Sequence, residues 1–258
     1  QLYAQEKVLD LDPFIDADDF DLEPFGPLAK DPDMCRSDKQ WALPILTTAG
    51  CPMFYNMDIF DEAGIEYPPT DWKDKSWNWD RVVEIAKKLT KNYGTADALY
   101  GVDSINQFHN WAYVFGGDCW TKEWCEHGIA EEGFTASKET IEGCTLRYNL
   151  IHEYQAHPTP SLSSAISELG DPFKTSRLAM NWTGGWGYWN YADITAFKWG
   201  AAPTPWGTSN KCANWTDCVL APKESKSPEL SWELIKYLTS REGQLEYTEA
   251  TNTPPTRE

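Results

Sequence analysis

The sequence is short of basic residues and has no long apolar run. Its 22 Lys and Arg stand against 40 Asp and Glu, which gives a formal net charge of -18 at pH 7. Nucleic acids and anionic membranes both need a basic face on their partner, so the charge argues against either. No stretch is apolar enough to span a membrane. The composition, 41% hydrophobic and 24% charged, instead suits a globular protein whose ligand is neutral or cationic.

Signatures of catalysis are also missing. There is no GxSxG, HExxH or P-loop pattern, and no GxGxxG followed by a suitably spaced acidic residue. Carboxylates are so numerous that no glycosidase-like pair is singled out. The histidines show no metal-ligand spacing, and we interpret all four as structural: His109, His127, His152 and His157. The sequence therefore predicts no catalytic residue, no metal site and no cofactor.

Tryptophan is abundant, with 14 residues. An indole ring stacks well on the apolar face of a sugar, on a base, on another aromatic ring or on a cation. For any single Trp, packing in the core is the alternative interpretation. Together they favour a ligand with flat faces and polar edges.

The seven cysteines include two pairs with the same spacing. Cys119 and Cys125 are six positions apart, as are Cys212 and Cys218, and each pair flanks a loop-like stretch. No CxxC motif is present, so a metal site is not indicated. We expect two local disulfides if the protein is exported, and buried free thiols are the alternative.

Short strands alternate with helices along the chain, which predicts an α/β fold. Extended segments are expected at residues 41–47, 50–56, 100–103, 177–182 and 197–202. Asn78 and Ser137 are expected to cap helices, since Asn and Ser accept hydrogen bonds from the first free N–H groups of a helix. The second of these helices is expected to bury a stripe comprising Ile141, Cys144, Tyr148 and Ile151.

Six segments, taken in order, resemble the family 1 extracellular solute-binding proteins, the group that includes maltose-binding proteins. The segments are residues 54–65 (FYNMDIFDEAGI), 79–90 (WDRVVEIAKKLT), 115–118 (FGGD), 173–186 (FKTSRLAMNWTGGW), 200–203 (GAAP) and 231–244 (SWELIKYLTSREGQ). The chain departs from the family pattern at the cysteine pairs, in a loop at 71–76, and at Gly185, where the family usually has Pro.

The resemblance implies a two-lobed, periplasmic-binding-protein-like fold of type II, with a ligand cleft between the lobes. Lobe 1 would take residues 1–50 and 204–250, lobe 2 residues 51–203, and residues 251–258 would lead onward. The chain opens without Met, so we interpret its start as internal to a longer chain whose leader lies upstream. The resemblance also implies that further family elements precede residue 1 and follow residue 258.

The resemblance also nominates ligand contacts. Trp186, after the turn formed by Gly184 and Gly185, stands where the family places a ligand-stacking aromatic residue, and Gly185 itself is also an expected ligand contact. For Trp111 a ligand contact and core packing stay open. Further expected contacts are Trp215 and Asp217, at a turn that faces the cleft in the family, and Thr47 and Thr48, whose hydroxyl groups could bind a sugar hydroxyl.

The function implied is reversible capture of a mono- or oligosaccharide by hinge closure, and delivery to the membrane permease of an ABC importer. The protein is then expected to be a monomer in the periplasm or on the outer face of the cell membrane, lipid-anchored or secreted. Two alternatives stay open. One is a secreted carbohydrate-active enzyme, and the other is a binding protein of the same fold for a polyamine or a peptide.

Overall fold

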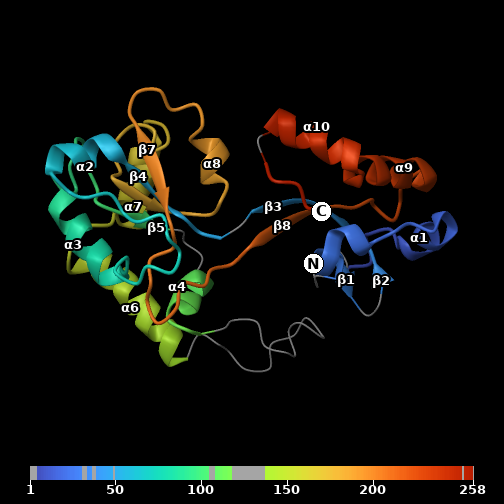
Figure 1. The fold of residues 1–258 in the computed structure, drawn as a ribbon, viewed down its shortest axis with the longest axis horizontal. Coiled ribbons are helices and arrows are strands. Elements are labelled where there is room, and N and C mark those ends of the chain that lie inside the picture. Colours follow the sequence, from blue (N-terminus) through green and yellow to red (C-terminus); the bar gives the residue numbers. More distant parts are fainter. Residues whose placement is uncertain are drawn as a thin grey trace. The chain divides into compact units, whose positions relative to one another are not determined.

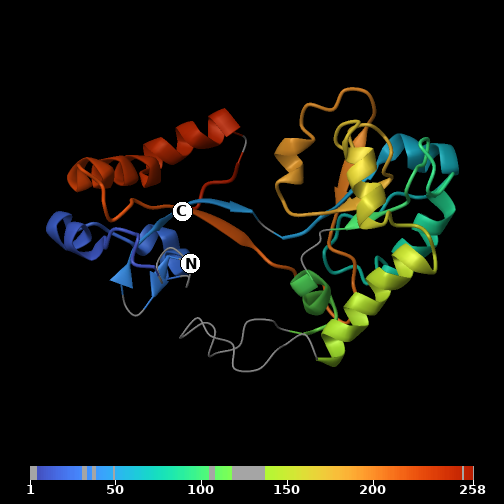
Figure 2. The ribbon, with the colours of Figure 1, turned by 180° about the vertical axis from the view of Figure 1, so that it is seen from behind.

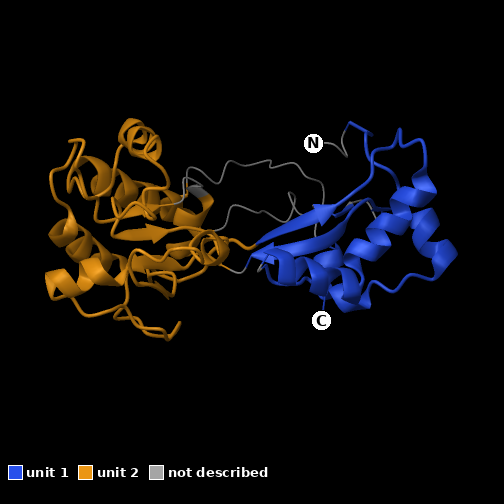
Figure 3. Cartoon of the chain, turned by 90° about the horizontal axis from the view of Figure 1, so that it is seen from above, with its two compact units in different colours: residues 1–48, 120–132, 215–258 blue, residues 49–119, 133–214 orange. Residues whose placement is uncertain are grey.

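The computed structural model describes residues 5–30, 34–36, 39–48, 50–104, 108–117, 137–251 and 253–257. The described residues form two compact units (Figure 3). Unit 1 takes its described residues from Gln1–Thr48 and Trp215–Glu258, and unit 2 from Ala49–Cys119 and Gly133–Asn214. The chain passes between the units after Thr48 and again after Asn214.

Unit 1 is organised around a pair of antiparallel strands, β3 and β8, with residues Leu43 to Thr48 paired to Val219 to Trp215. A second strand pair, β1 with β2, lies near the start of the chain (Figure 1). In the core of unit 1, Leu11 and Leu43 pack against Trp232 and Ile235 of α9. The elements of unit 1 are α1 (Asp12–Asp18), η1 (Glu23–Lys30), β1 (Cys35–Arg36), β2 (Lys39–Gln40), β3 (Leu43–Thr48), β8 (Trp215–Val219), α9 (Pro228–Thr239) and α10 (Arg241–Thr251).

Unit 2 contains a four-stranded sheet in the order β5-β6-β4-β7. Strand β4 is antiparallel to both of its neighbours, and β5 runs parallel to β6. Helices α6 and α7 lie on the side of the sheet that Figure 2 turns to the viewer. The elements of unit 2 are β4 (Met53–Asn56), α2 (Met57–Ala63), α3 (Trp79–Leu89), β5 (Asp103–Ser104), α4 (Phe108–Val114), α6 (Lys138–His152), α7 (Pro160–Ser167), β6 (Met180–Trp182), α8 (Gly187–Asn190) and β7 (Trp199–Ala202).

The unit boundaries differ from the sequence expectation mainly at the second crossing. Residues 204–214 belong to unit 2, because Thr204 Oγ1 donates to the carbonyl oxygen of Cys51 at 2.6 Å and the Trp206 N–H donates to that of Trp77 at 2.9 Å. The end of the chain packs back on unit 1, since Thr256 Oγ1 donates to the carbonyl oxygen of Pro44 at 2.9 Å. Within the described residues, no helix has the length and apolar character needed to cross a membrane.

Helix starts follow the local capping chemistry. The Asn78 side chain accepts the N–H of Arg81 at 3.0 Å, and Ser137 Oγ accepts the N–H of Thr140 at 3.1 Å. Both expected caps are confirmed. Each satisfies one of the backbone donors that the first turn of a helix leaves free.

The expected inward stripe of α6 is confirmed at Ile151 but is wrong at Ile141, Cys144 and Tyr148, which are exposed. Ile141 is 55% exposed and Tyr148 61% exposed, while Gly143 and Leu150 face the interior. A Cβ atom on Gly143 would lie 2.4 Å from the carbonyl oxygen of Trp111 on α4. Close backbone contact at a glycine, rather than apolar periodicity, therefore sets which face of α6 is buried.

Candidate functional site

Four of the expected ligand residues come together where β3 and β8 pair in unit 1. Thr48 pairs with Trp215, and Asp217 lies opposite Leu46. Thr47 and Thr48 each place Oγ1 3.4 Å from the carbonyl oxygen of Trp215. Trp215 and Asp217 are two positions apart on one strand, so they share a face about 7 Å apart, whereas Thr47, opposite Thr216, lies on the other face. This places a half-buried indole ring and an exposed carboxylate side by side.

Trp186 occupies a well-anchored position in unit 2. The N–H of Gly185 donates to the carbonyl oxygen of Gly50 at 3.1 Å, and the N–H of Gly50 donates to Asn214 Oδ1 at 2.8 Å. A Cβ atom on Gly184 would lie 2.2 Å from Cζ3 of Trp186, so only glycine lets the indole lie against this turn. The side chain of Trp186 is half-buried. The turn before Trp186 is thus held beside Gly50, and the Trp186 ring lies against Gly184.

Trp111 lies in the core of unit 2. Its side chain is fully buried, with its ring centroid 4.6 Å from that of Trp79 and 4.9 Å from that of Trp182. The tilted and edge-on geometry is typical of packed aromatic residues. Of the two interpretations that the sequence left open for Trp111, this placement fits core packing. We therefore do not carry Trp111 into the proposed ligand site.

One aromatic residue near Gly50 was missed by the sequence analysis. Trp72 is 46% exposed, and its ring atom Cη2 lies 3.6 Å from where a Cβ atom of Gly50 would stand. Its carbonyl oxygen accepts hydrogen bonds from Trp206 Nε1 at 3.2 Å and Asn210 Nδ2 at 2.8 Å. Its position in the loop that departs from the family pattern was the available signal. A Trp in such a loop is a better candidate for a ligand contact than a Trp in a helix, where core packing is the usual role.

One of the two predicted disulfides is wrong in this structure. Cys212 and Cys218 are not bonded to each other. Cys218 lies in β8 opposite Pro44, whereas Cys212 precedes the strand and contacts Cys51. The other predicted pair, Cys119 and Cys125, lies outside the described residues.

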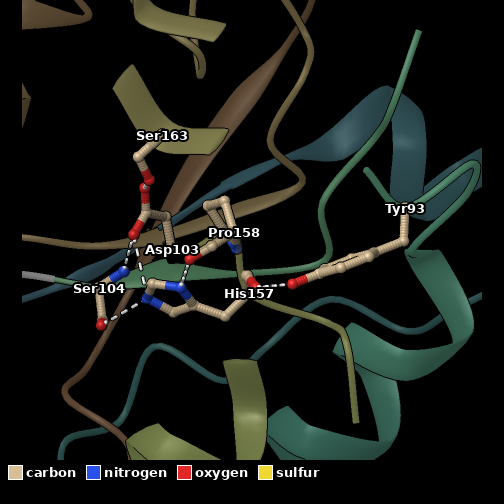
Figure 4. A network of polar contacts seen from close by, with 6 residues as sticks. All are labelled: Tyr93, Asp103, Ser104, His157, Pro158 and Ser163. Atoms are coloured by element: carbon tan, nitrogen blue, oxygen red, sulfur yellow. Dashed lines mark hydrogen bonds and ion pairs between the residues drawn. The ribbon is translucent and has the colours of Figure 1, made fainter. Parts of the chain in front are cut away.

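A Ser, a His and an Asp meet in unit 2, in an arrangement that tests the enzyme alternative (Figure 4). His157 Nε2 lies 2.9 Å from Ser104 Oγ and 3.0 Å from Asp103 Oδ1. His157 Nδ1 donates to the carbonyl oxygen of Pro158 at 2.7 Å, since that oxygen can only accept. A hydrolase triad needs the carboxylate on one ring nitrogen and the nucleophile on the other.

In this protein one nitrogen faces both groups, and the ring is only 2% exposed. The structural role expected for His157 is confirmed, because it ties β5 to the segment between α6 and α7. These contacts form a buried hydrogen-bond network that does not have the geometry of a hydrolase triad.

Other features of the described residues do not compete with this site. A cavity of about 630 Å³ in unit 1 is lined by two ion pairs, Lys39 with Asp10 and Lys223 with Glu6, together with Val8, Leu9, Gln40 and Trp41. None of the expected ligand residues lines it. No group of three or more His, Cys, Asp or Glu side chains is placed to hold a metal ion within the described ranges.

Two α/β units, between which the described part of the chain passes after Thr48 and after Asn214, define the class: a two-lobed, periplasmic-binding-protein-like fold. A family model described as bacterial extracellular solute-binding protein matches residues 1–245. The chain belongs to this family. The fold and the family expected from the sequence are both confirmed.

Individual relatives are distant. A binding protein of Brucella abortus is 23% identical over 218 residues, which cover 82% of this chain and 49% of the relative. An ABC substrate-binding protein from Listeria monocytogenes, in complex with cycloalternan, superposes with a TM-score of 0.82 at 24% identity, covering 99% of this chain and 63% of that one. UgpB from Mycobacterium tuberculosis, in complex with glycerophosphocholine, gives 0.76 at 16% identity, covering 99% and 61%. At these identities the superpositions show the fold alone. The chain spans about half the length of the curated relatives it matches.

Proposed function

We propose that this chain binds a carbohydrate, a mono- or oligosaccharide, and delivers it to the membrane permease of an ABC importer. The observation that carries the proposal is the half-buried Trp186, held on the turn formed by Gly184 and Gly185. Its ring can stack on the C–H face of a sugar. On unit 1, Asp217 and the edge of Trp215, which share a face of β8, offer an acceptor and a donor to hydroxyl groups. The Listeria protein, bound to cycloalternan, supports a carbohydrate by likeness of fold.

The chemistry of the proposed contacts supports binding without catalysis. Asp217 is the only carboxylate among the proposed contacts, and glycoside hydrolysis uses a pair. The Ser104–His157 contact is buried and has the wrong ring nitrogen facing Asp103. We therefore propose that the bound sugar is released unchanged. We also propose that the protein acts as a monomer, either in the periplasm or on the outer face of the cell.

A second candidate is a ligand with a cationic ammonium group, either quaternary as in choline or unsubstituted as in a polyamine. Glycerophosphocholine in UgpB motivates it, since indole rings also bind cations and the chain carries a net charge of -18. A thermal-shift screen of the full-length protein separates the two candidates. Maltose, maltotriose and cycloalternan form one arm, and glycerophosphocholine and spermidine form the other.

At a ligand concentration of about 100 times Kd, the free energy of unfolding rises by about 2.7 kcal/mol, which corresponds to roughly 5–10 °C in Tm. A shift of this size with a sugar is expected, together with unchanged sugar by mass spectrometry after a long incubation. A shift with the cationic arm alone, or cleavage of the sugar, would overturn the proposal.

A further inference from the structure

Two cysteines that are distant in the sequence meet inside unit 2. The N–H of Cys51 donates to Cys212 Sγ at 3.1 Å, although 161 positions separate the two residues. The two thiols hydrogen-bond one another, and Cys51 Sγ also lies 3.6 Å from Asn110 Oδ1. Cys51 is fully buried, whereas Cys212 is half-buried. A protected sulfur therefore faces one that reagents can reach.

The approach of the two sulfurs does not depend on a single contact. Thr204 Oγ1 donates to the carbonyl oxygen of Cys51 at 2.6 Å and lies 3.5 Å from Cys212 Sγ. The N–H of Ala213, the next residue, donates to Asn110 Oδ1 at 2.9 Å. A Cβ atom on Gly50 would stand 3.2 Å from Cys212 Sγ. Both backbone segments are thus held in place whether or not the sulfurs are bonded.

We propose that Cys51 and Cys212 are joined by a disulfide bond when the protein folds in an oxidising compartment. The family is extracellular, and disulfides persist in that environment. Cys51 lies three positions after Thr48 and Cys212 three before Trp215, the residues at which the chain leaves and re-enters unit 1. The bond would clamp these two segments of unit 2 together beside Gly50, which anchors the turn before Trp186. The proposal does not depend on the identity of the ligand.

The oxidant is an external disulfide, such as oxidised glutathione or the active-site disulfide of a thiol oxidoreductase. The thiolate of Cys212 attacks one sulfur of that disulfide, forms a mixed disulfide and expels the first thiolate. The thiol of Cys51 then attacks Cys212 Sγ, forms the new bond and expels the second thiolate, which takes up the Cys51 proton. Two protein thiols lose two electrons in total, and the external disulfide becomes two thiols.

The electrostatics favour Cys212 as the attacking sulfur. The hydrogen bond from the Cys51 thiol lowers the pKa of Cys212 to about 6, against the opposing effect of burial. The same hydrogen bond and burial raise the pKa of Cys51. At neutral pH the more accessible sulfur is the nucleophile, which is the order that the exchange needs.

Peptide mapping tests the proposal. The full-length protein, folded in a glutathione redox buffer, is alkylated and digested with trypsin without reduction. Residues 40–73 form a peptide whose only cysteine is Cys51, and residues 212–223 form one that holds Cys212 and Cys218. We expect the two peptides to be cross-linked in the native protein and in Cys218→Ser, the matched control. In Cys51→Ser and Cys212→Ser the cross-link is expected to be absent.

Thermal unfolding gives a second readout that does not depend on mapping. A reductant is expected to lower the Tm of the native protein and of Cys218→Ser by on the order of 10 °C, since the bond closes a long loop. The same reductant should leave the Tm of Cys51→Ser unchanged. A bridge within the peptide of residues 212–223, or alkylation of both Cys51 and Cys212 in the folded protein, would overturn the proposal.

Discussion

Truncating two tryptophans to alanine should have opposite consequences, because one packs in the core and the other lies at a turn. Trp111 is fully buried between Trp79 and Trp182. Truncating a fully buried aromatic residue costs about 3–5 kcal/mol, so Trp111→Ala should lower Tm by roughly 6–20 °C. Trp186 is half-buried and rests on a glycine turn. Because the cost scales with the apolar area that is buried, Trp186→Ala should lower the free energy of unfolding by only about 1–2 kcal/mol.

The order is reversed for ligand affinity. Stacking of a sugar ring on the indole of Trp186 should contribute about 1–2 kcal/mol, so Trp186→Ala should raise Kd by roughly 5- to 30-fold. Trp111→Ala should leave the Kd of the folded fraction unchanged. Gly184→Ala is the matched variant that keeps the Trp186 ring but displaces it, and it should weaken binding similarly.

Titration calorimetry for the ligand and thermal unfolding without it measure the two effects separately. If Trp186→Ala loses as much stability as Trp111→Ala while its affinity stays intact, Trp186 is a core residue and the reasoning is refuted.

Three further predictions concern local features. Gly143→Ala should destabilise the protein by about 1–3 kcal/mol in urea unfolding, although Ala favours helices, because its Cβ would meet the Trp111 carbonyl oxygen; unchanged stability would contradict this contact. Asn78→Ala should cost about 1 kcal/mol through loss of the α3 cap, and Asn78→Asp should restore it; equal losses in both variants would show that the cap is not the cause. In the reduced protein, alkylation of Cys212 should persist at neutral pH and fall as the pH drops through its lowered pKa of about 6. Cys51→Ala should move the midpoint of this pH dependence upward, because it removes the hydrogen bond that lowers the pKa. A midpoint at the pKa of an ordinary thiol in the native protein would contradict the Cys51 hydrogen bond.

Features fixed by neighbouring residues were predictable from the sequence. The caps at Asn78 and Ser137 depend on side chains that reach three residues along the chain. The strand at Leu43–Thr48 and the turn before Trp186 likewise follow from local composition. Their physical causes lie within one turn or one strand, so no tertiary information is needed.

Features fixed by tertiary contacts were not predictable in the same way. The buried face of α6 depends on how closely Gly143 approaches Trp111, which its apolar periodicity does not encode. Spacing suggested a partner for Cys212 six positions away, but its contact, Cys51, is 161 positions distant. The exposure of Trp72 depends on a loop held by Trp206 and Asn210 from another part of the chain.

The central claim is that this chain captures a carbohydrate on Trp186. Titration calorimetry of the full-length protein with maltotriose and cycloalternan, alongside glycerophosphocholine and spermidine, tests it most directly. The account predicts saturable one-to-one binding of a sugar, weakened about tenfold by Trp186→Ala, with no detectable binding of glycerophosphocholine or spermidine. Saturable binding of glycerophosphocholine or spermidine with no response to either sugar would contradict the account, as would sugar binding that Trp186→Ala leaves unchanged.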